Sequence, residues 1–313
     1  MGLSTVIRHI ATSYDGPVIA AAEFEHRLHI FDLETGQKVA TFDSIMDFGG
    51  RRLAISPDGQ QCAAGAYHAH GLAMYDAGSG ELLWQRKDLK KVQQLQFSKQ
   101  DPVLLACFER GPAHVLDLSS GATLRTMRGI SRIEESPFGR FRIVCRSGRY
   151  EILDDERHVR IGQRGPGDFY EATFTPSSVV LCEFELTGKP MEELPSIREQ
   201  LHGAACFSLE DGRSLWRHMF PTGINVQRFG FAESVGEIVS VTWPYVRGGD
   251  KNLVCFDKDT GEIRREFGLL KGPLSETEFA RRGNLLITSA GEVINVAERK
   301  VAQRLDFPPQ PAS

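Results

Sequence analysis

Short apolar runs recur along the whole chain. Residues 18–22, 103–108 and 178–182 are examples, and each is largely apolar at successive positions instead of alternating apolar with polar residues. A β-strand with one face in water alternates, whereas a strand that is covered on both faces is apolar throughout. The pattern therefore predicts short strands in sheets that cover one another.

One turn, with the pattern Asp-x-x-(Ser/Thr)-Gly, recurs four times behind such runs. Its copies begin at Asp32, Asp76, Asp117 and Asp257. The glycine suits a turn position with positive φ, and the aspartate can accept hydrogen bonds from backbone amides two or three residues further on. Each copy therefore predicts a strand, a tight turn and a second strand.

Weaker copies of the turn extend the repeat over the rest of the chain, with Asp154, Ser208 and Asn295 at the position of the turn aspartate. The steps between copies run from 37 residues (117 to 154) to 54 residues (154 to 208). A second turn stands upstream of each copy, as Ser-Pro-Asp-Gly does at 56–59. Seven repeats of four strands at this period predict an all-β fold, a seven-bladed β-propeller of four-stranded antiparallel blades.

We expect one domain over residues 1–313, with strands a to d of each blade following one another outwards from the axis. The last strand of the seventh repeat, 301–305, is expected within its own repeat, and residues 1–6 are left to add or exchange an edge strand there. The expected blades are 7–43, 48–87, 91–128, 132–161, 168–219, 224–267 and 274–307.

Two stretches resemble a known superfamily. Residues 74–84, Met-Tyr-Asp-Ala-Gly-Ser-Gly-Glu-Leu-Leu-Trp, and 53–59, Leu-Ala-Ile-Ser-Pro-Asp-Gly, are similar to repeats of WD-repeat-like and quinoprotein-like (YVTN-type) β-propellers. The resemblance covers residues 7–307 and implies the fold. It implies no single function, because the superfamily includes scaffolds, inhibitors and enzymes. No repeat has the Trp-Asp or Gly-His pair of strict WD repeats, so their buried polar network is not implied.

Composition narrows the classes of function. A net charge of −4 and a pI near 6.2 argue against general nucleic-acid binding, which usually needs a strongly basic face. No stretch has the length and apolarity of a membrane span, and the N-terminus lacks the apolar core of a signal peptide. We therefore expect a soluble cytoplasmic protein that does not contact a membrane. Reduced, buried thiols are expected for the cysteines at 62, 107, 145, 182, 206 and 255, which fall within predicted strands.

The long connections all fall at one end of the predicted blades. In an a–b–c–d meander, the b–c and d–a connections share one end, which we call the loop face, and the a–b and c–d turns share the other, the turn face. The long connections are 185–203 and 243–250 between strands b and c, and 43–50, 162–170 and 220–225 between blades. Insertions on one face of a repeat array usually build its binding face.

Two sets of residues are predicted to bind a partner on the loop face. Cations near the start of strand a would converge on the mouth of the channel and attract an acidic segment or an anionic ligand. Aromatic residues and arginines in the connections are types that are enriched in interaction hot spots. The alternative for each is a structural role, capping a strand end or filling a gap between blades. The cationic set is Arg51, Arg52, Lys91, Arg132 and Arg228, and the rim set is Phe48, Phe169, Tyr170, Trp243, Tyr245 and Arg247.

Catalytic motifs are scarce. The chain has no Gly-x-Ser-x-Gly, no His-Glu-x-x-His and no phosphate-binding loop, and we expect no cofactor. His68 and His70 are weak candidates for half of a metal site, and their alternative is bonding to backbone or water.

These patterns favour a non-enzymatic protein-interaction module, a scaffold or a stoichiometric inhibitor of the immunity type. It would hold another protein, through an acidic segment, and would be monomeric by itself. The alternatives are a metal-assisted hydrolase or lactonase and a sensor of a small anionic ligand.

Overall fold

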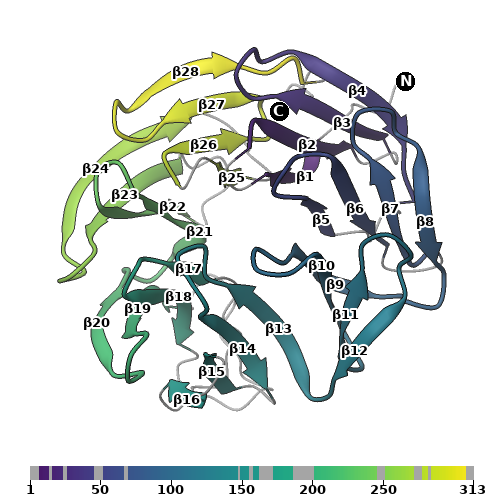
Figure 1. Ribbon diagram of the computed structural model, residues 1–313. Coiled ribbons are helices and arrows are strands. Elements are labelled where there is room, and N and C mark those ends of the chain that lie inside the picture. The colour runs from purple at the N-terminus through teal and green to yellow at the C-terminus, as the bar shows by residue number, and fades with distance from the viewer. Residues whose placement is uncertain are drawn as a thin grey trace. The chain divides into compact units, whose positions relative to one another are not determined.

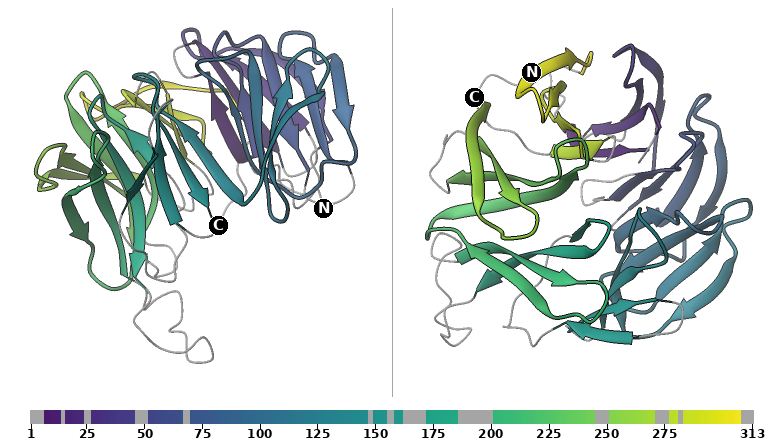
Figure 2. Two further views of the ribbon diagram at one scale, coloured as in Figure 1. Left: turned by 60° about the horizontal axis from the view of Figure 1, so that its bottom comes forward. Right: turned by 60° about the vertical axis from the view of Figure 1, so that its left-hand side comes forward.

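The computed structural model describes residues 7–13, 16–23, 27–45, 52–66, 70–146, 149–154, 158–161, 172–185, 201–244, 251–270, 277–280 and 283–307 (Figure 1). Their strands form seven four-stranded antiparallel sheets, and each sheet is a meander of four consecutive strands (Figure 2). The all-β, seven-bladed propeller fold predicted from the sequence is confirmed. No helix in the described part of the chain is long and apolar enough to cross a membrane.

The chain divides into two compact units, and the first comprises residues 1–133 and 274–313. Its sheets are β1 (Ile7–Thr12), β2 (Val18–Glu23), β3 (Arg27–Asp32) and β4 (Lys38–Asp43); β5 (Arg52–Ile55), β6 (Gln61–Gly65), β7 (Leu72–Asp76) and β8 (Leu82–Arg86); β9 (Val92–Phe97), β10 (Val103–Phe108), β11 (Ala113–Asp117) and β12 (Thr123–Met127); and β25 (Thr277–Ala280), β26 (Leu285–Thr288), β27 (Glu292–Asn295) and β28 (Lys300–Arg304).

The second unit comprises residues 134–273, and its first strand begins in unit 1. Its sheets are β13 (Ile130–Glu135), β14 (Arg142–Arg146), β15 (Arg149–Leu153) and β16 (His158–Ile161); β17 (Ala172–Phe174), β18 (Ser178–Glu185), β19 (Leu201–Ser208) and β20 (Ser214–Met219); and β21 (Ile224–Ala232), β22 (Glu237–Pro244), β23 (Lys251–Asp257) and β24 (Ile263–Leu270). The assignment of residues 1–313 to one domain stays a prediction.

The seventh sheet is completed by its own repeat. Its outer strand β28 pairs with β27, from Glu292 opposite Arg304 to Asn295 opposite Lys300. This agrees with the strand expected at 301–305, while residues 1–6, expected as a possible edge strand, lie outside the described residues.

The recurrent turn forms through its aspartate. The Asp32 carboxylate accepts hydrogen bonds from the Glu34 amide at 3.0 Å and from the Thr35 amide at 2.7 Å. Gly36 has φ of 71°, a left-handed conformation that suits glycine because it has no Cβ. The same φ region recurs at the turn glycines Gly80, Gly121 and Gly261. Local sequence alone therefore accounts for these hairpins.

Neighbouring sheets within a unit lock together through strand d and the next turn. The indole nitrogen of Trp84, on β8, donates to the carbonyl of Leu118 at 2.7 Å, and its ring lies on Gly121. Trp216, on β20, repeats the contact in unit 2, donating to Lys258 at 2.9 Å beside Gly261. The turn glycine is thus required twice, for its φ and for the close approach of an indole ring.

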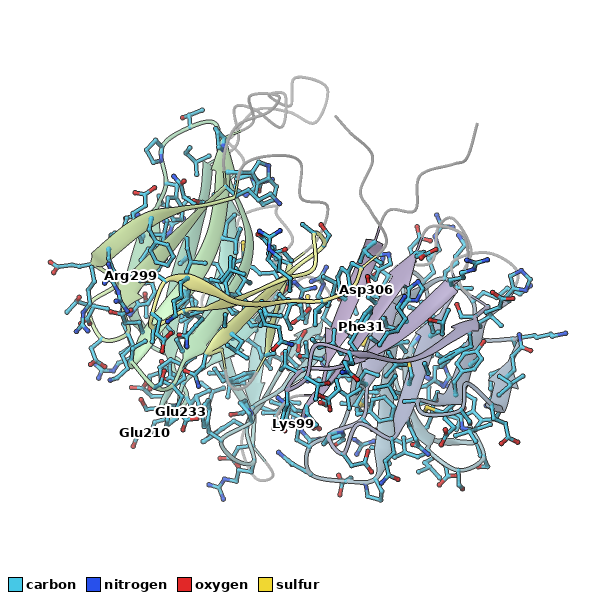
Figure 3. All side chains as sticks on the ribbon, turned by 90° about the horizontal axis from the view of Figure 1, so that it is seen from above. Phe31, Lys99, Glu210, Glu233, Arg299 and Asp306 are labelled. Carbon is cyan, nitrogen blue, oxygen red and sulfur yellow. The ribbon has the colours of Figure 1, made fainter. Side chains whose placement is uncertain are left out.

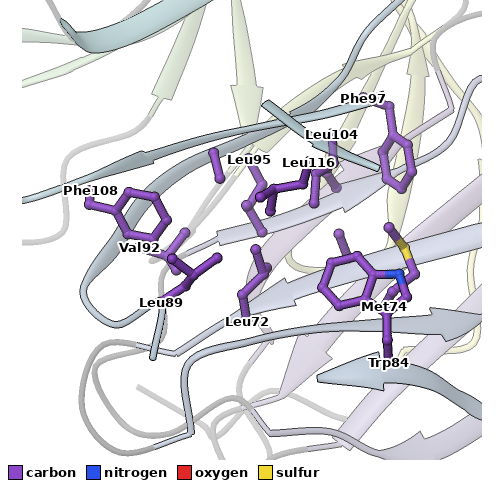
Figure 4. Close-up of a cluster of buried hydrophobic side chains, with 13 residues drawn as sticks. Leu72, Met74, Trp84, Leu89, Val92, Leu95, Phe97, Leu104, Phe108 and Leu116 are labelled. Carbon is purple, nitrogen blue, oxygen red and sulfur yellow. The ribbon is translucent and has the colours of Figure 1, made fainter. Parts of the chain in front are cut away.

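Buried apolar side chains fill the space between sheets. In unit 1, Leu72, Met74, Trp84, Leu104 and Leu116 belong to one cluster drawn from two successive sheets (Figure 4). In unit 2, a comparable cluster contains several aromatic rings around the fully buried Phe256. All six cysteines are free and buried, as the sequence predicts.

Candidate interaction face

The turn face is regular and satisfies its own hydrogen bonds. In all four complete copies of the turn, the glycine amide donates to the aspartate carbonyl at 2.9 Å. Hydrogen bonds from the backbone amide of Ser79 and from its hydroxyl lower the pKa of the Asp76 carboxyl. Figure 3 labels Glu210 and Glu233, which stand in turns at this end of unit 2. A surface whose polar groups are already paired offers few free groups to a partner.

Strand b extends further at the loop face in two of the three sheets of unit 2, and we call these two strands, β18 and β22, the raised strands. Strand b of the third sheet, β10, has 6 residues, whereas β22 has 8. Both begin opposite the turn aspartate, with Val103 opposite Asp117 and Glu237 opposite Asp257. The extra residues therefore extend β22 at the loop face, by about 7 Å at about 3.3 Å per residue. β18 also has 8 residues and stays paired as far as Glu185 opposite Leu201.

Trp243 stands at the end of this raised strand. Its side chain is half-buried, and its residue lies opposite Asn225 of the inner strand β21. The Nζ atom of the buried Lys251, the first residue of β23, lies 4.7 Å from the centroid of the indole ring. A cation held over an aromatic face stabilises the pair by roughly 0.5–2 kcal/mol. Trp243 is therefore an ordered aromatic group on the loop face, as an anchor for a partner should be.

Three of the predicted cations are described in unit 1. Arg52 is the first residue of β5, opposite Gly65, and is half-buried. Arg132 is the third residue of β13 and is also half-buried. Lys91 directly precedes β9, with a left-handed φ of 59°, and its Nζ lies 3.1 Å from Oε2 of Glu109. All three thus stand at or near the start of an inner strand.

Glu109 is a residue that the sequence reasoning missed. Its amide donates to the Lys91 carbonyl at 2.9 Å, and its carboxylate offsets the charge of Lys91. Glu109 could have been found by following the pairing of strands a and b away from the a–b turn. Phe108 pairs with Val92, so the next residues along the two strands, Glu109 and Lys91, lie opposite each other. The loop face of unit 1 carries less net positive charge than the cations alone suggest.

Arg228 lies deeper than expected. β21 runs from Ile224 to Ala232, so Arg228 is in mid-strand, opposite Val241 and beside a bulge. Its Nε atom is buried. The long inner strand of this tall sheet begins four residues earlier, at Ile224, which moves Arg228 away from the strand start.

The remaining predicted site residues give little further information. His70 is exposed, and its carbonyl accepts a hydrogen bond from Gln85 at 2.9 Å. Among the described residues, no group of three or more His, Cys, Asp or Glu side chains could hold a metal ion. Outside the described residues lie Arg51, Phe48, Phe169, Tyr170, Tyr245, Arg247 and His68.

Comparison with known proteins bears on the fold. No protein-family model matches the chain, and no curated protein matches it. Among solved structures, the chain is similar to U3-55K, with a TM-score of 0.68 and 13% sequence identity over 92% of this chain and 89% of that one. This likeness supports the propeller fold. At such low identity it shows the fold alone, and the quinoprotein-like part of the resemblance stays a prediction.

Proposed function

We propose that the chain is a protein-interaction module that holds its partner on the loop face. The observation that carries this proposal is the difference between the two ends of the sheets. The turn face consists of uniform turns that pair their own polar groups. The loop face carries the raised strands of unit 2 and an aromatic side chain held in place by Lys251.

The proposed partner is another protein with an acidic segment. The cations that would attract this segment are Arg52, Lys91 and Arg132 of unit 1. Glu109 weakens the attraction because its carboxylate offsets the charge of Lys91. A scaffold and a stoichiometric inhibitor of the immunity type fit this arrangement equally. Binding, not catalysis, is the proposed task of this face, without a cofactor and by a chain that is monomeric by itself.

We also propose a cytoplasmic location, which the six free, buried cysteines support, since thiols stay reduced there. The metal-assisted hydrolase or lactonase and the small-anion sensor stay alternatives.

The test is a capture experiment from native lysate with matched charge variants. One variant replaces Arg52, Lys91 and Arg132 with Gln on the loop face. The control replaces Arg213, Lys258 and Lys300 with Gln, which removes the same charge from the turn face. A third variant, Trp243→Ala, removes the ordered indole, and thermal melting checks that each variant is folded.

We expect a partner protein to bind the wild type and the turn-face control in stoichiometric amount. It should bind the loop-face variants at least about tenfold more weakly, because a hot-spot side chain contributes about 1–2 kcal/mol or more to binding. Equal retention by all variants would place the binding site elsewhere and contradict the proposal.

A further inference from the structure

Three polar side chains form a chain of hydrogen bonds across the first sheet. Glu23 ends β2, His29 lies in β3 and Thr41 lies in β4. The Nε2 atom of His29 lies 2.5 Å from Oε1 of Glu23, and its Nδ1 atom lies 2.9 Å from Oγ1 of Thr41. Glu23 and His29 are 5% and 4% exposed, whereas Thr41 is exposed. The chain of bonds therefore runs from the interior to a hydroxyl in water.

The direction of these bonds follows from the carboxylate. An ionised carboxylate only accepts hydrogen bonds, so Nε2 of His29 carries the hydrogen and Nδ1 is the free acceptor. The Thr41 hydroxyl then donates to Nδ1. Within the described part of the chain, Oε2 of Glu23 is buried and has no hydrogen-bond partner, so the hydrogen bond from the His29 imidazole to Oε1 is the one that stabilises the carboxylate. This is the arrangement in which an imidazole acts as a base toward a hydroxyl.

The propeller fold does not require this arrangement. His29 stands three residues before the turn aspartate, and the same place is taken by Ala73, Ala205 and Val254 in three of the other sheets. In the remaining three it is taken by His114, Glu151 and Glu292. An apolar residue therefore suffices for packing at this place, and the link from a buried carboxylate through a histidine to a threonine hydroxyl is described in the first sheet.

The third sheet holds a natural comparison. His114 lies opposite Thr126 of the outer strand in the backbone register, as His29 lies opposite Thr41, but the buried Nδ1 atom of His114 has no hydrogen-bond partner among the described residues. At the place of Glu23, however, stands Phe108, whose ring meets that of His114 edge-on at 5.5 Å between centroids. Burial lowers the pKa of His114, and Phe108 offers it no carboxylate in the place where Glu23 bonds His29. The chain thus contains one histidine that links a buried carboxylate to a threonine hydroxyl, and one that lies opposite a threonine without either link.

We propose that Thr41 is an acyl-acceptor site, with His29 as its general base and Glu23 as the residue that positions His29. The substrate class is an activated carboxylic ester or thioester. Thr41 Oγ1 forms a bond to the carbonyl carbon while its proton passes to Nδ1 of His29. The bond from that carbon to the leaving oxygen or sulfur breaks, and the leaving group takes the proton from His29. The product is an ester of Thr41.

A cation lies on the same edge of the sheet. Lys38 is opposite Phe31, and its Nζ atom lies 6.0 Å from the centroid of the Phe31 ring. The ring centroids of Phe31 and His29 are 6.2 Å apart. Asp306 approaches Lys38 at 3.9 Å, and Phe31 and Asp306 are labelled in Figure 3. Lys38 stands three residues before Thr41 on β4, and an ammonium group placed beside the reacting carbonyl would stabilise the negative charge that develops on its oxygen during acyl transfer.

The experiment treats the full chain with p-nitrophenyl acetate and follows nitrophenolate release and the mass of the peptide that contains Thr41. We expect acetyl on Thr41 and at least about tenfold less on Thr126, because general-base catalysis contributes roughly 10²–10⁴-fold. Thr41→Val should abolish the label and Thr41→Ser should keep it. Thr41 is exposed, so neither change disturbs the core.

Glu23→Gln and His29→Gln test the base, with melting curves as a check on folding. Both should slow labelling of Thr41 by about tenfold or more and leave Thr126 unchanged. Equal labelling of Thr41 and Thr126, or labelling of Thr41 that Glu23→Gln leaves unchanged, would overturn the proposal.

Discussion

At the scale of the residue, the turn aspartates link sequence to structure most directly. Asp117 accepts hydrogen bonds from the hydroxyls of Ser119 and Ser120, both at 2.6 Å, and from the Ser120 amide at 2.8 Å. These bonds favour the ionised carboxylate and, with the Ser119 hydroxyl contributing most, lower the pKa of Asp117 from 3.8 to about 2. The folded turn therefore needs its aspartate charged.

Stability should consequently fall in acid. A carboxyl whose pKa is lower in the folded state contributes stability above its unfolded pKa and loses it as the pH falls through the folded pKa. For Asp117 this window runs from about pH 4 to about pH 2. Urea unfolding of Asp117→Asn should show a flatter pH dependence there than the wild type. The control is Asp43→Asn, an exposed carboxylate outside the turns, and profiles of equal slope for Asp117→Asn and the wild type would contradict the expectation.

At the scale of the element, strand d of one sheet is held by the turn of the next. A Cβ atom on Gly121 would lie 2.7 Å from Cε3 of Trp84, closer than packed atoms tolerate. The indole also gives the Leu118 carbonyl its hydrogen bond. The tryptophan and the glycine belong to different repeats, so each repeat is completed by its neighbour.

This contact should be measurable as a difference between two glycine variants. Gly121→Ala should destabilise the protein by about 1–2 kcal/mol for the positive φ and by more for the clash with Trp84. Gly236→Ala is the control, because its φ of 66° is similar and a Cβ there meets nothing within 4 Å. Trp84→Phe should cost about 1–3 kcal/mol by leaving the Leu118 carbonyl unpaired. Equal unfolding free energies for the two alanine variants would show that the contact contributes nothing.

At the scale of the whole molecule, the cysteines report on cooperativity. Cys62 and Cys107 belong to unit 1, and Cys145, Cys182, Cys206 and Cys255 belong to unit 2. Burial raises the pKa of Cys62 to about 12 and that of Cys206 to about 11, so these two thiols form little reactive thiolate in the folded protein.

The single-domain prediction therefore has a direct test. In increasing urea, all six thiols should become reactive toward a thiol reagent in one transition, because one domain unfolds as a unit. Pulsed labelling with mass spectrometry resolves the six sites. Exposure of Cys62 and Cys107 at one urea concentration and of the other four at another would show two independently folding units instead.

The sequence by itself determined the seven four-stranded sheets, their turns and the burial of the cysteines, because these depend on strand periodicity and on turn residues that act over a few positions. It also placed Trp243 and Lys91 on the loop face. Only the tertiary structure decided that Glu109 offsets Lys91, that Arg228 lies in mid-strand and that Glu23, His29 and Thr41 meet across three strands. Those outcomes depend on strand register and strand length, which follow from how the strands of a sheet pair with one another and not from any short stretch of the chain.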